Sequence, residues 1–166
     1  MSTLENIKSK ILSGESLEHQ LNRWRFFKNK IVFTNGCFDL LHAGHIDYLS
    51  KAAGMGDALI IGLNSDDSVN RLKGKNRPIN NQEQRSLILA SLGFVSAVVL
   101  FEEDTPYNLI LKIKPQVLVK GGDYKPQQIA GADVVLANGG EVKIIELLPG
   151  YSTTDIEMRI LNAGNS

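Results

Sequence analysis

IVFTNGCFDLLHAGH, residues 31–45, joins a short apolar run to a polar turn and then to the start of a helix. The run 31–34 has no polar alternation, which indicates a strand buried on both faces. Asn35-Gly36 marks a turn, and apolar residues at helical spacing over 44–54 end at Gly54, a common stop signal for a helix. A buried strand followed by a turn and a helix is typical of the first unit of a parallel α/β sheet.

The same alternation of strands and helices continues to the end of the chain. Apolar runs predict further strands at 58–63, 97–100, 116–119, 134–136 and 142–145. Helical spacing predicts helices at 81–92, 105–113 and 153–162, while 125–131 is expected to form a short helix or turn and the polar segment 66–80 a loop or frayed helix. We therefore expect a doubly wound parallel α/β sheet, whose ligand lies at the carboxyl ends of the strands near the point where strand order reverses.

Residues 1–29 differ from this main domain, residues 30–166. They are more polar, and their apolar residues follow helical spacing that is interrupted at Ser13-Gly14. The pattern predicts an N-terminal extension of two short helices lying over the main domain, with Trp24 as a packing anchor.

Composition excludes several classes of protein. The chain has 166 residues, enough for one self-sufficient core, with 18 Lys+Arg against 18 Asp+Glu. Zero net charge gives no global field to attract nucleic acid or anionic lipid. A single Cys excludes an internal disulfide, and the chain shows no signal-peptide pattern and no apolar run long enough to span a membrane. We expect a cytoplasmic protein with neither nucleic acid nor membrane as a partner.

The turn and helix start at 35–45 carry the strongest chemical signal. A helix start offers unpaired backbone N–H groups and partial positive charge, to which His42 and His45 can add donors, while Gly44 leaves room for a phosphate. The spacing is neither G-x-G-x-x-G nor a P-loop. Zinc is the alternative ligand of two imidazoles, but the H-x-x-H spacing, the lone Cys37 and the distant His19 argue against it.

NGCFDLLHAGH, 35–45, resembles the first signature of the HxGH, or cytidylyltransferase-like, nucleotidyltransferase superfamily, and GYSTTDI, 150–156, resembles the second. Within the superfamily the chain is similar to the D-glycero-D-manno-heptose 1-phosphate adenylyltransferase domain, on the segments NSD at 64–66, RLKGKNRPIN at 71–80, EEDTP at 102–106, VKGGDY at 119–124 and NGGEV at 138–142. The resemblance implies a Rossmann-like fold and a reaction of lipopolysaccharide core biosynthesis. In that reaction ATP and heptose 1-phosphate give ADP-heptose and pyrophosphate with the help of Mg²⁺.

The resemblance also implies roles for individual residues. His42 and His45, with Lys75, would stabilise the transition state at the α-phosphate. Nucleotide binding would involve Asn35, Gly36, Cys37, Phe38, His42, Gly44, His45, Lys73, Gly150, Tyr151, Ser152, Thr153 and Thr154. Acceptor binding would involve Asp39, Lys73, Arg85, Lys120 and Asp123. No protein side chain is expected to ligate the metal directly, apart from Asp123, which could help place it. A homodimer is expected.

The chemical groups of these residues agree with a nucleotidyltransferase reaction, and they leave alternative functions open. A sugar phosphate is already an anionic nucleophile, so donors and cations matter more than a general base. Cys37 is expected to be a small apolar filler rather than a nucleophile, and Ser152-Thr153-Thr154 can also be read as a plain N-cap run. The stretch 146–149 lacks the Arg that some members of the superfamily carry. A cytidylyltransferase that uses CTP with glycerol 3-phosphate, phosphocholine or phosphoethanolamine is the runner-up, and a nucleotide-binding regulatory module without turnover is the non-enzymatic alternative.

Overall fold

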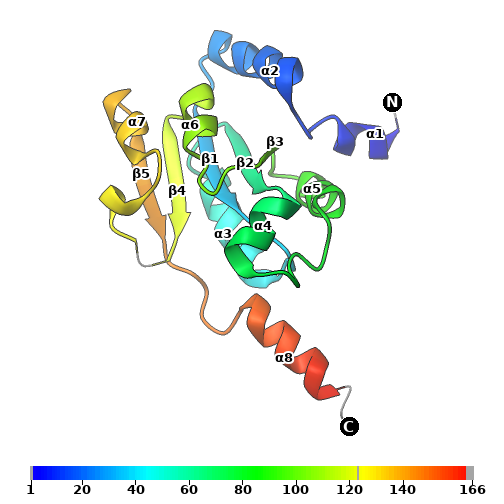
Figure 1. Ribbon diagram of the computed structural model, residues 1–166. Helices are drawn as coiled ribbons and strands as arrows, with labels where there is room; N and C mark the ends of the chain where they lie inside the picture. Colours follow the sequence, from blue (N-terminus) through cyan, green and yellow to red (C-terminus); the bar gives the residue numbers. More distant parts are fainter. Residues whose placement is uncertain (1, 123, 164–166) are drawn as a thin grey trace.

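Five strands form one parallel sheet in the computed structural model, which describes residues 2–122 and 124–163 (Figure 1). The strands are β1 (Ile31–Gly36), β2 (Ala58–Asn64), β3 (Ala97–Phe101), β4 (Val117–Gly121) and β5 (Glu141–Ile145). Their order across the sheet is β3-β2-β1-β4-β5, and every neighbouring pair is parallel. The order reverses between β1 and β4, so the prediction of a doubly wound α/β sheet is confirmed.

Helices cover both faces of this sheet, and alternate strand residues supply two separate cores. Ile31 and Phe33 of β1 point into one core, which is completed by α2 (Gly14–Phe26), α6 (Tyr107–Ile113) and α7 (Ala132–Ala137). Val32 points into the other core, which is completed by α3 (Ala43–Ala53) and α5 (Gln82–Ser91). This two-sided burial is the reason that β1 and β2 carry no polar alternation, whereas the edge strand β5 alternates between exposed and partly buried residues.

The N-terminal segment follows the edge of the sheet and forms the two predicted helices. In α1 (Thr3–Lys8), Ile7 packs against the core beside α5, whereas Leu17 and Leu21 of α2 are buried in the core of the opposite face. Between the two helices Ile11 forms a parallel bridge with Val98 of the edge strand β3. Residues 2–29 therefore pass from one face of the sheet to the other, and Trp24 packs partly against the core, as expected of an anchor.

Two sequence predictions need correction. Residues 134–136 lie in α7 and not in a strand, because a run of three apolar residues cannot be distinguished by its periodicity from the buried side of a helix. The segment 66–80 begins with a regular helix, α4 (Asp66–Lys73), which Ser65 caps by accepting a hydrogen bond from the backbone N–H of Ser68. Only its second half is a loop. The segment 125–131 contains the 3₁₀ turn η1 (Pro126–Gln128).

The last helix, α8 (Thr153–Ala163), extends away from the sheet beyond the carboxyl end of β5 (Figure 1). None of its residues is buried, but Arg77 joins it to the loop that follows α4 through an ion pair of 2.5 Å with Glu157. None of the helices in the described part of the chain has the length and apolar character needed to cross a bilayer.

Candidate active site

A cavity of about 200 Å³ opens at the carboxyl ends of β1 and β4, where the strand order reverses. Its lining is formed by Asn35, Gly36, Cys37, Phe38, Asp39, His45, Tyr48, Lys73, Lys120, Gly121, Leu147 and Thr153. The position agrees with the sequence prediction, since open α/β sheets bind ligands at this point. A larger surface groove, about 850 Å³, lies beside α6 and is lined by none of the predicted site residues.

Two stacked imidazoles mark the start of α3. The rings of His42, the N-cap residue, and His45 have centroids 3.9 Å apart and planes 25° apart. Their Nδ1 atoms are buried without a hydrogen-bond partner among the described residues. Burial lowers the pKa of both side chains, that of His45 to about 4, where the charges of His42 and Lys73 act in the same direction. Near pH 7 the pair is therefore neutral and each ring keeps one N–H to donate.

Gly44 is the point where the two predicted signatures meet. A Cβ at this position would lie 3.0 Å from Cβ of Tyr151 and 3.1 Å from the ring of His42. The rings of Tyr151 and His42 lie nearly parallel, with centroids 6.4 Å apart. Absence of a side chain at Gly44 thus allows the segment before α8 to approach the start of α3, which brings 35–45 and 150–156 together.

The residues at the start of α8 have different structural roles. The Ser152 hydroxyl accepts a hydrogen bond of 3.0 Å from the backbone N–H of Asp155, so Ser152 caps the helix. Thr153 lines the cavity, whereas Thr154 lines a separate hollow with Ile79 and residues of α8. Gly150, with φ of +82°, makes the turn that precedes them.

The turn after β1 is shaped by Phe38. This residue adopts the left-handed region, with φ of +44°, and its ring contacts the ring of His45 edge-on at 5.4 Å. Gly36 makes room for it, because a Cβ there would lie 2.9 Å from the Phe38 ring. Burial raises the pKa of the neighbouring Cys37 thiol, which supports the interpretation of Cys37 as a filler in the cavity wall.

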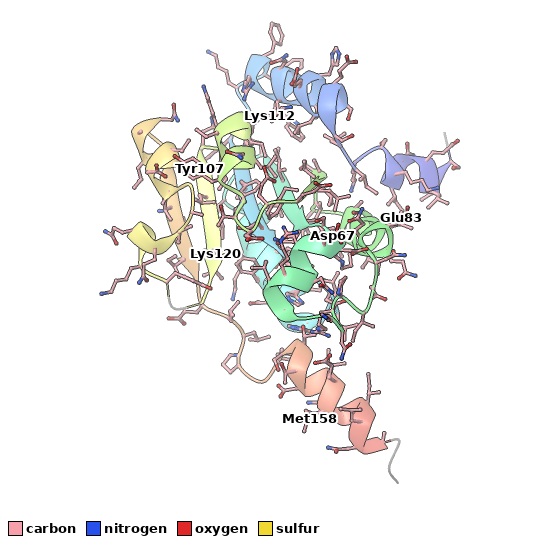
Figure 2. All side chains as sticks on the ribbon, in the orientation of Figure 1. Asp67, Glu83, Tyr107, Lys112, Lys120 and Met158 are labelled. Atoms are coloured by element: carbon pink, nitrogen blue, oxygen red, sulfur yellow. The ribbon has the colours of Figure 1, made fainter. Side chains whose placement is uncertain are left out.

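Two of the predicted cations reach the cavity. Lys73 ends α4, and Lys120 lies near the carboxyl end of β4, where Figure 2 labels it. The Lys120 ammonium donates to the amide oxygen of Asn35 at 3.3 Å, and its pKa is lowered by burial. No carboxylate of the described residues forms an ion pair with it. Lys75 is exposed in the loop beyond α4 and outside the cavity lining.

Arg85 does not line the cavity, which argues against the predicted contact with a substrate phosphate. Its side chain is fully buried, and its guanidinium donates to the carbonyl oxygens of Cys37 and Asn64 and to the carboxylate of Asp66. The Nε–H donates to the carbonyl oxygen of Asn80. Arg85 therefore ties the turns after β1 and β2 together from beneath the site.

Asp39 has a comparable role in ordering loops. Its buried carboxylate accepts hydrogen bonds from the backbone N–H groups of Ile79 and Asn80, at 2.8 and 3.0 Å, and pairs with Arg77 at 3.2 Å. The first loop is thereby joined to the segment 77–80, and through Arg77 to α8. The remaining predicted acceptor residue, Asp123, lies outside the described residues.

Tyr48 is a residue of the cavity that sequence reasoning missed. Its hydroxyl lies 2.5 Å from the Thr34 hydroxyl and 3.3 Å from the carbonyl oxygen of Val119, so it bridges β1 and β4 under the cavity. Burial raises its pKa to about 12, which keeps it a neutral donor. Its position three residues after His45, on the same side of a helix, is the signal that could have identified it.

The described part of the chain offers few side-chain ligands for Mg²⁺. No group of three His, Cys, Asp or Glu side chains gathers among residues 2–122 and 124–163 in a way that could hold a metal. The carboxylate nearest the cavity, Asp39, is already engaged by two N–H groups and Arg77. The residues that the structure describes therefore form no protein cage for Mg²⁺, an ion that is often bound largely through substrate phosphates.

Comparison with known proteins places the chain among nucleotidyltransferase-like folds. A cytidylyltransferase-like family model matches residues 33–159. "Bifunctional protein HldE" of Campylobacter concisus is 54% identical over 160 residues, which are 96% of this chain and 33% of that protein. HldE of Wolinella succinogenes is 54% identical over 153 residues, 92% of this chain and 31% of that protein. The chain thus spans about a third of the length of these curated relatives.

Two solved structures are also similar. A lipopolysaccharide core biosynthesis protein from Thermoplasma volcanium is 28% identical with a TM-score of 0.57, over 72% of this chain and 97% of that one. Pantoate-beta-alanine ligase from Francisella tularensis is 19% identical with a TM-score of 0.58, over 90% of this chain and 76% of that one. The second likeness concerns the fold alone.

Proposed function

The chain belongs to the cytidylyltransferase-like family, and from this premise we propose that it transfers AMP from ATP to a heptose 1-phosphate, releasing pyrophosphate. The relatives named HldE and the lipopolysaccharide core biosynthesis protein support a sugar phosphate as acceptor. The observation that carries the proposal is the neutral, stacked pair His42 and His45 at the start of α3. Tyr151 of the second signature packs against this helix start at Gly44.

The attack requires no general base. The acceptor phosphate is already an anion, and its oxygen attacks the α-phosphorus of ATP while pyrophosphate leaves on the opposite side. The protein must hold two anions in line and stabilise charge on the α-phosphate oxygens. His42 and His45 supply N–H donors there, next to the unpaired backbone N–H groups at the start of α3.

The start of α8 is the second proposed binding site for the triphosphate. Its first backbone N–H groups, with the hydroxyl of Thr153, are suited to the β- and γ-phosphates of ATP. Lys73 lines the cavity, and we propose that it meets phosphates of both substrates. The exposed Lys75 can reach them only if the loop after α4 moves toward the cavity. Mg²⁺ would enter on the phosphates and neutralise part of their charge.

The test is a matrix of four nucleoside triphosphates against heptose 1-phosphate, glycerol 3-phosphate, phosphocholine and phosphoethanolamine, with pyrophosphate release as the readout. We expect ATP with heptose 1-phosphate to give the fastest release. Turnover with CTP and one of the other acceptors would replace the proposal by a cytidylyltransferase, and no release from any pair would overturn the enzyme assignment.

Variants separate a catalytic site from a site that only binds nucleotide. His42→Ala should lower kcat/KM about 10²- to 10³-fold, the usual effect of losing one donor to a developing anion. His19→Ala changes an exposed histidine of α2 and should leave the rate unchanged. If both variants retain wild-type turnover, His42 has no part in the chemistry.

A further inference from the structure

A groove separate from the reaction cavity lies between α1 and α5, at the edge of the sheet. It measures about 560 Å³, within the range of about 300–1,000 Å³ that is typical of small-molecule pockets. Its lining is formed by Lys8, Ile11, Glu83, Gln84, Ser86, Leu87 and Leu100. None of these residues lines the reaction cavity or belongs to a signature segment, so the proposed function gives this groove no role.

The wall of the groove is largely apolar and is assembled from three segments. Ile11 follows α1, Leu87 belongs to α5, and Leu100 belongs to the edge strand β3. Ile11 and Leu87 are half-buried, and Leu100 is 36% exposed. A molecule that covers these three side chains removes apolar surface from water, which favours a ligand with an apolar body.

Ser86 adds one polar group to this wall. The residue is 2% exposed, and its hydroxyl is buried without a hydrogen-bond partner among the described residues. A buried hydroxyl that stays unpaired costs free energy, which a ligand atom that pairs with it would recover. In the described part of the chain this condition is shared by Nδ1 of His42 and Nδ1 of His45, at the proposed triphosphate site. The Ser86 hydroxyl therefore also points to a ligand.

The charges at the rim disfavour an ionic ligand. Lys8 and Glu83, the second of which Figure 2 labels, are exposed, and neither forms an ion pair with another described residue. One cation and one anion leave the rim without net charge, whereas Lys73 and Lys120 make the reaction cavity basic. A nucleotide or a sugar phosphate is therefore a poor match for the groove, and an uncharged molecule is a good one.

We infer that the groove between α1 and α5 is a second ligand site, which takes an uncharged molecule with an apolar body and one group that hydrogen-bonds to the Ser86 hydroxyl. Its position connects it to the reaction site, because the preceding residue, Arg85, donates to the carbonyl oxygens of Cys37 and Asn64. Binding here is independent of the proposed function, since it requires neither a nucleotide nor turnover.

Indole is the probe for this site, because it is uncharged and mostly apolar and has one N–H donor. The matched ligand is 1-methylindole, which lacks this donor. Binding is followed by NMR through the backbone amide shifts of Ser86, Leu87 and Leu100. The quantity of interest is the ratio of the Kd for 1-methylindole to the Kd for indole, because comparing this ratio between proteins cancels the effect of the extra methyl group.

Ser86→Ala should lower this ratio about two- to tenfold, the effect of one neutral hydrogen bond. Ser91→Ala is the matched control, because Ser91 lies on the same helix, donates to the carbonyl oxygen of Ile88 and does not line the groove. It should keep the wild-type ratio. An equal ratio in wild type and Ser86→Ala, or no saturable shift of the three amides with millimolar indole, overturns the inference.

A second pair of variants tests the place of binding. Leu87→Trp fills the groove, whereas Ile88→Trp adds the same ring at the next position, which is exposed and outside the lining. We expect indole binding to be lost in Leu87→Trp and kept in Ile88→Trp, and binding that survives in both variants would show that the ligand lies elsewhere.

Urea unfolding shows whether the Ser86 hydroxyl is free in the native protein. Ser86→Ala should be at least as stable as wild type without indole, because it removes an unpaired buried hydroxyl. A clearly less stable variant would show that this hydroxyl is already paired within the fold, which would overturn its role as a ligand-binding group.

Discussion

The rings of His42 and His45 stack with their centroids 3.9 Å apart, and this contact influences both the packing and the charge of the site. One ring belongs to the cap of α3 and the other to its first turn. Two imidazolium ions at this distance would repel each other, and burial disfavours the charged form further. The pair is therefore held neutral in a place where a highly charged ligand is proposed to bind.

The stacked pair predicts an unusual titration. His45 should titrate near pH 4 in the free protein, and ATP should raise this pKa because phosphate charge favours the protonated ring. Proton NMR of the imidazole resonances, assigned with a His45→Gln variant, measures both values. A His45 pKa near the ordinary value of about 6.5 in the free protein would contradict the neutral pair.

The same shift has a consequence for stability. A histidine whose folded pKa lies below its unfolded pKa stabilises the native state above the unfolded value, and this contribution is lost as the pH falls toward the folded value. Between pH 6.5 and 4 the wild-type protein should therefore lose more unfolding free energy than His45→Gln. Urea titrations at several pH values provide the comparison, and parallel curves for the two proteins would be the opposite result.

Gly44 should be intolerant of a methyl group. Gly44→Ala places a Cβ against Tyr151 and His42, so the start of α8 must move away from the start of α3. We expect kcat/KM to fall, but by less than the roughly 10²-fold loss that a misplacement of about 1 Å causes. Gly54→Ala at the end of the same helix is the control, because its nearest neighbours lie 3.5 Å away and its φ of −67° suits alanine. Equal activity in the two variants would show that the approach of Tyr151 has no role.

Arg85 should matter for folding rather than for substrate binding. Arg85→Ala leaves three carbonyl oxygens and the Asp66 carboxylate without their donor, and we expect a loss of about 3–5 kcal/mol in unfolding free energy. Arg71→Ala, which breaks an exposed ion pair with Asp104, should cost about 1 kcal/mol or less. Urea unfolding distinguishes the two, and a fully stable Arg85→Ala with weakened acceptor binding would restore the original prediction for Arg85.

Asp39 should behave as a loop anchor. In Asp39→Asn an amide replaces a carboxylate that accepts from two backbone N–H groups and pairs with Arg77, so unfolding free energy should fall by about 1–3 kcal/mol. Asp47→Asn removes a surface pair with Lys51 within α3 and should cost about 0.5 kcal/mol or less. A similar cost at both positions would indicate that the 77–80 segment does not depend on Asp39.

Much of the architecture could be predicted because the central strands β1, β2 and β4 are largely buried. Apolar runs predict all five strands, including the more exposed edge strand β5, and the turn Asn35-Gly36 at the end of β1 locates the site. The run 134–136 was misassigned because three residues carry too little periodicity to separate a strand from a helix. The bridge between Ile11 and Val98 could not be foreseen, since long-range pairing of a single residue leaves no local pattern.

The site itself could be predicted where its residues are contiguous in sequence, and not where they come from distant segments. The His42–His45 spacing is local, so its place at a helix start followed from the sequence. Arg85 looked equally basic and equally close to the site, but whether a cation faces solvent or carbonyl oxygens depends on the turns packed around it. The role of Lys75, the homodimer and the metal arrangement stay predictions.

A crystal structure of the protein with a non-hydrolysable ATP analogue tests most directly whether the two helix starts bind one triphosphate. We expect the α-phosphate to lie against His42 and His45 and the β- and γ-phosphates to lie at the first N–H groups of α8. An analogue bound with its triphosphate away from both helix starts, or in contact with only one of them, would contradict this expectation.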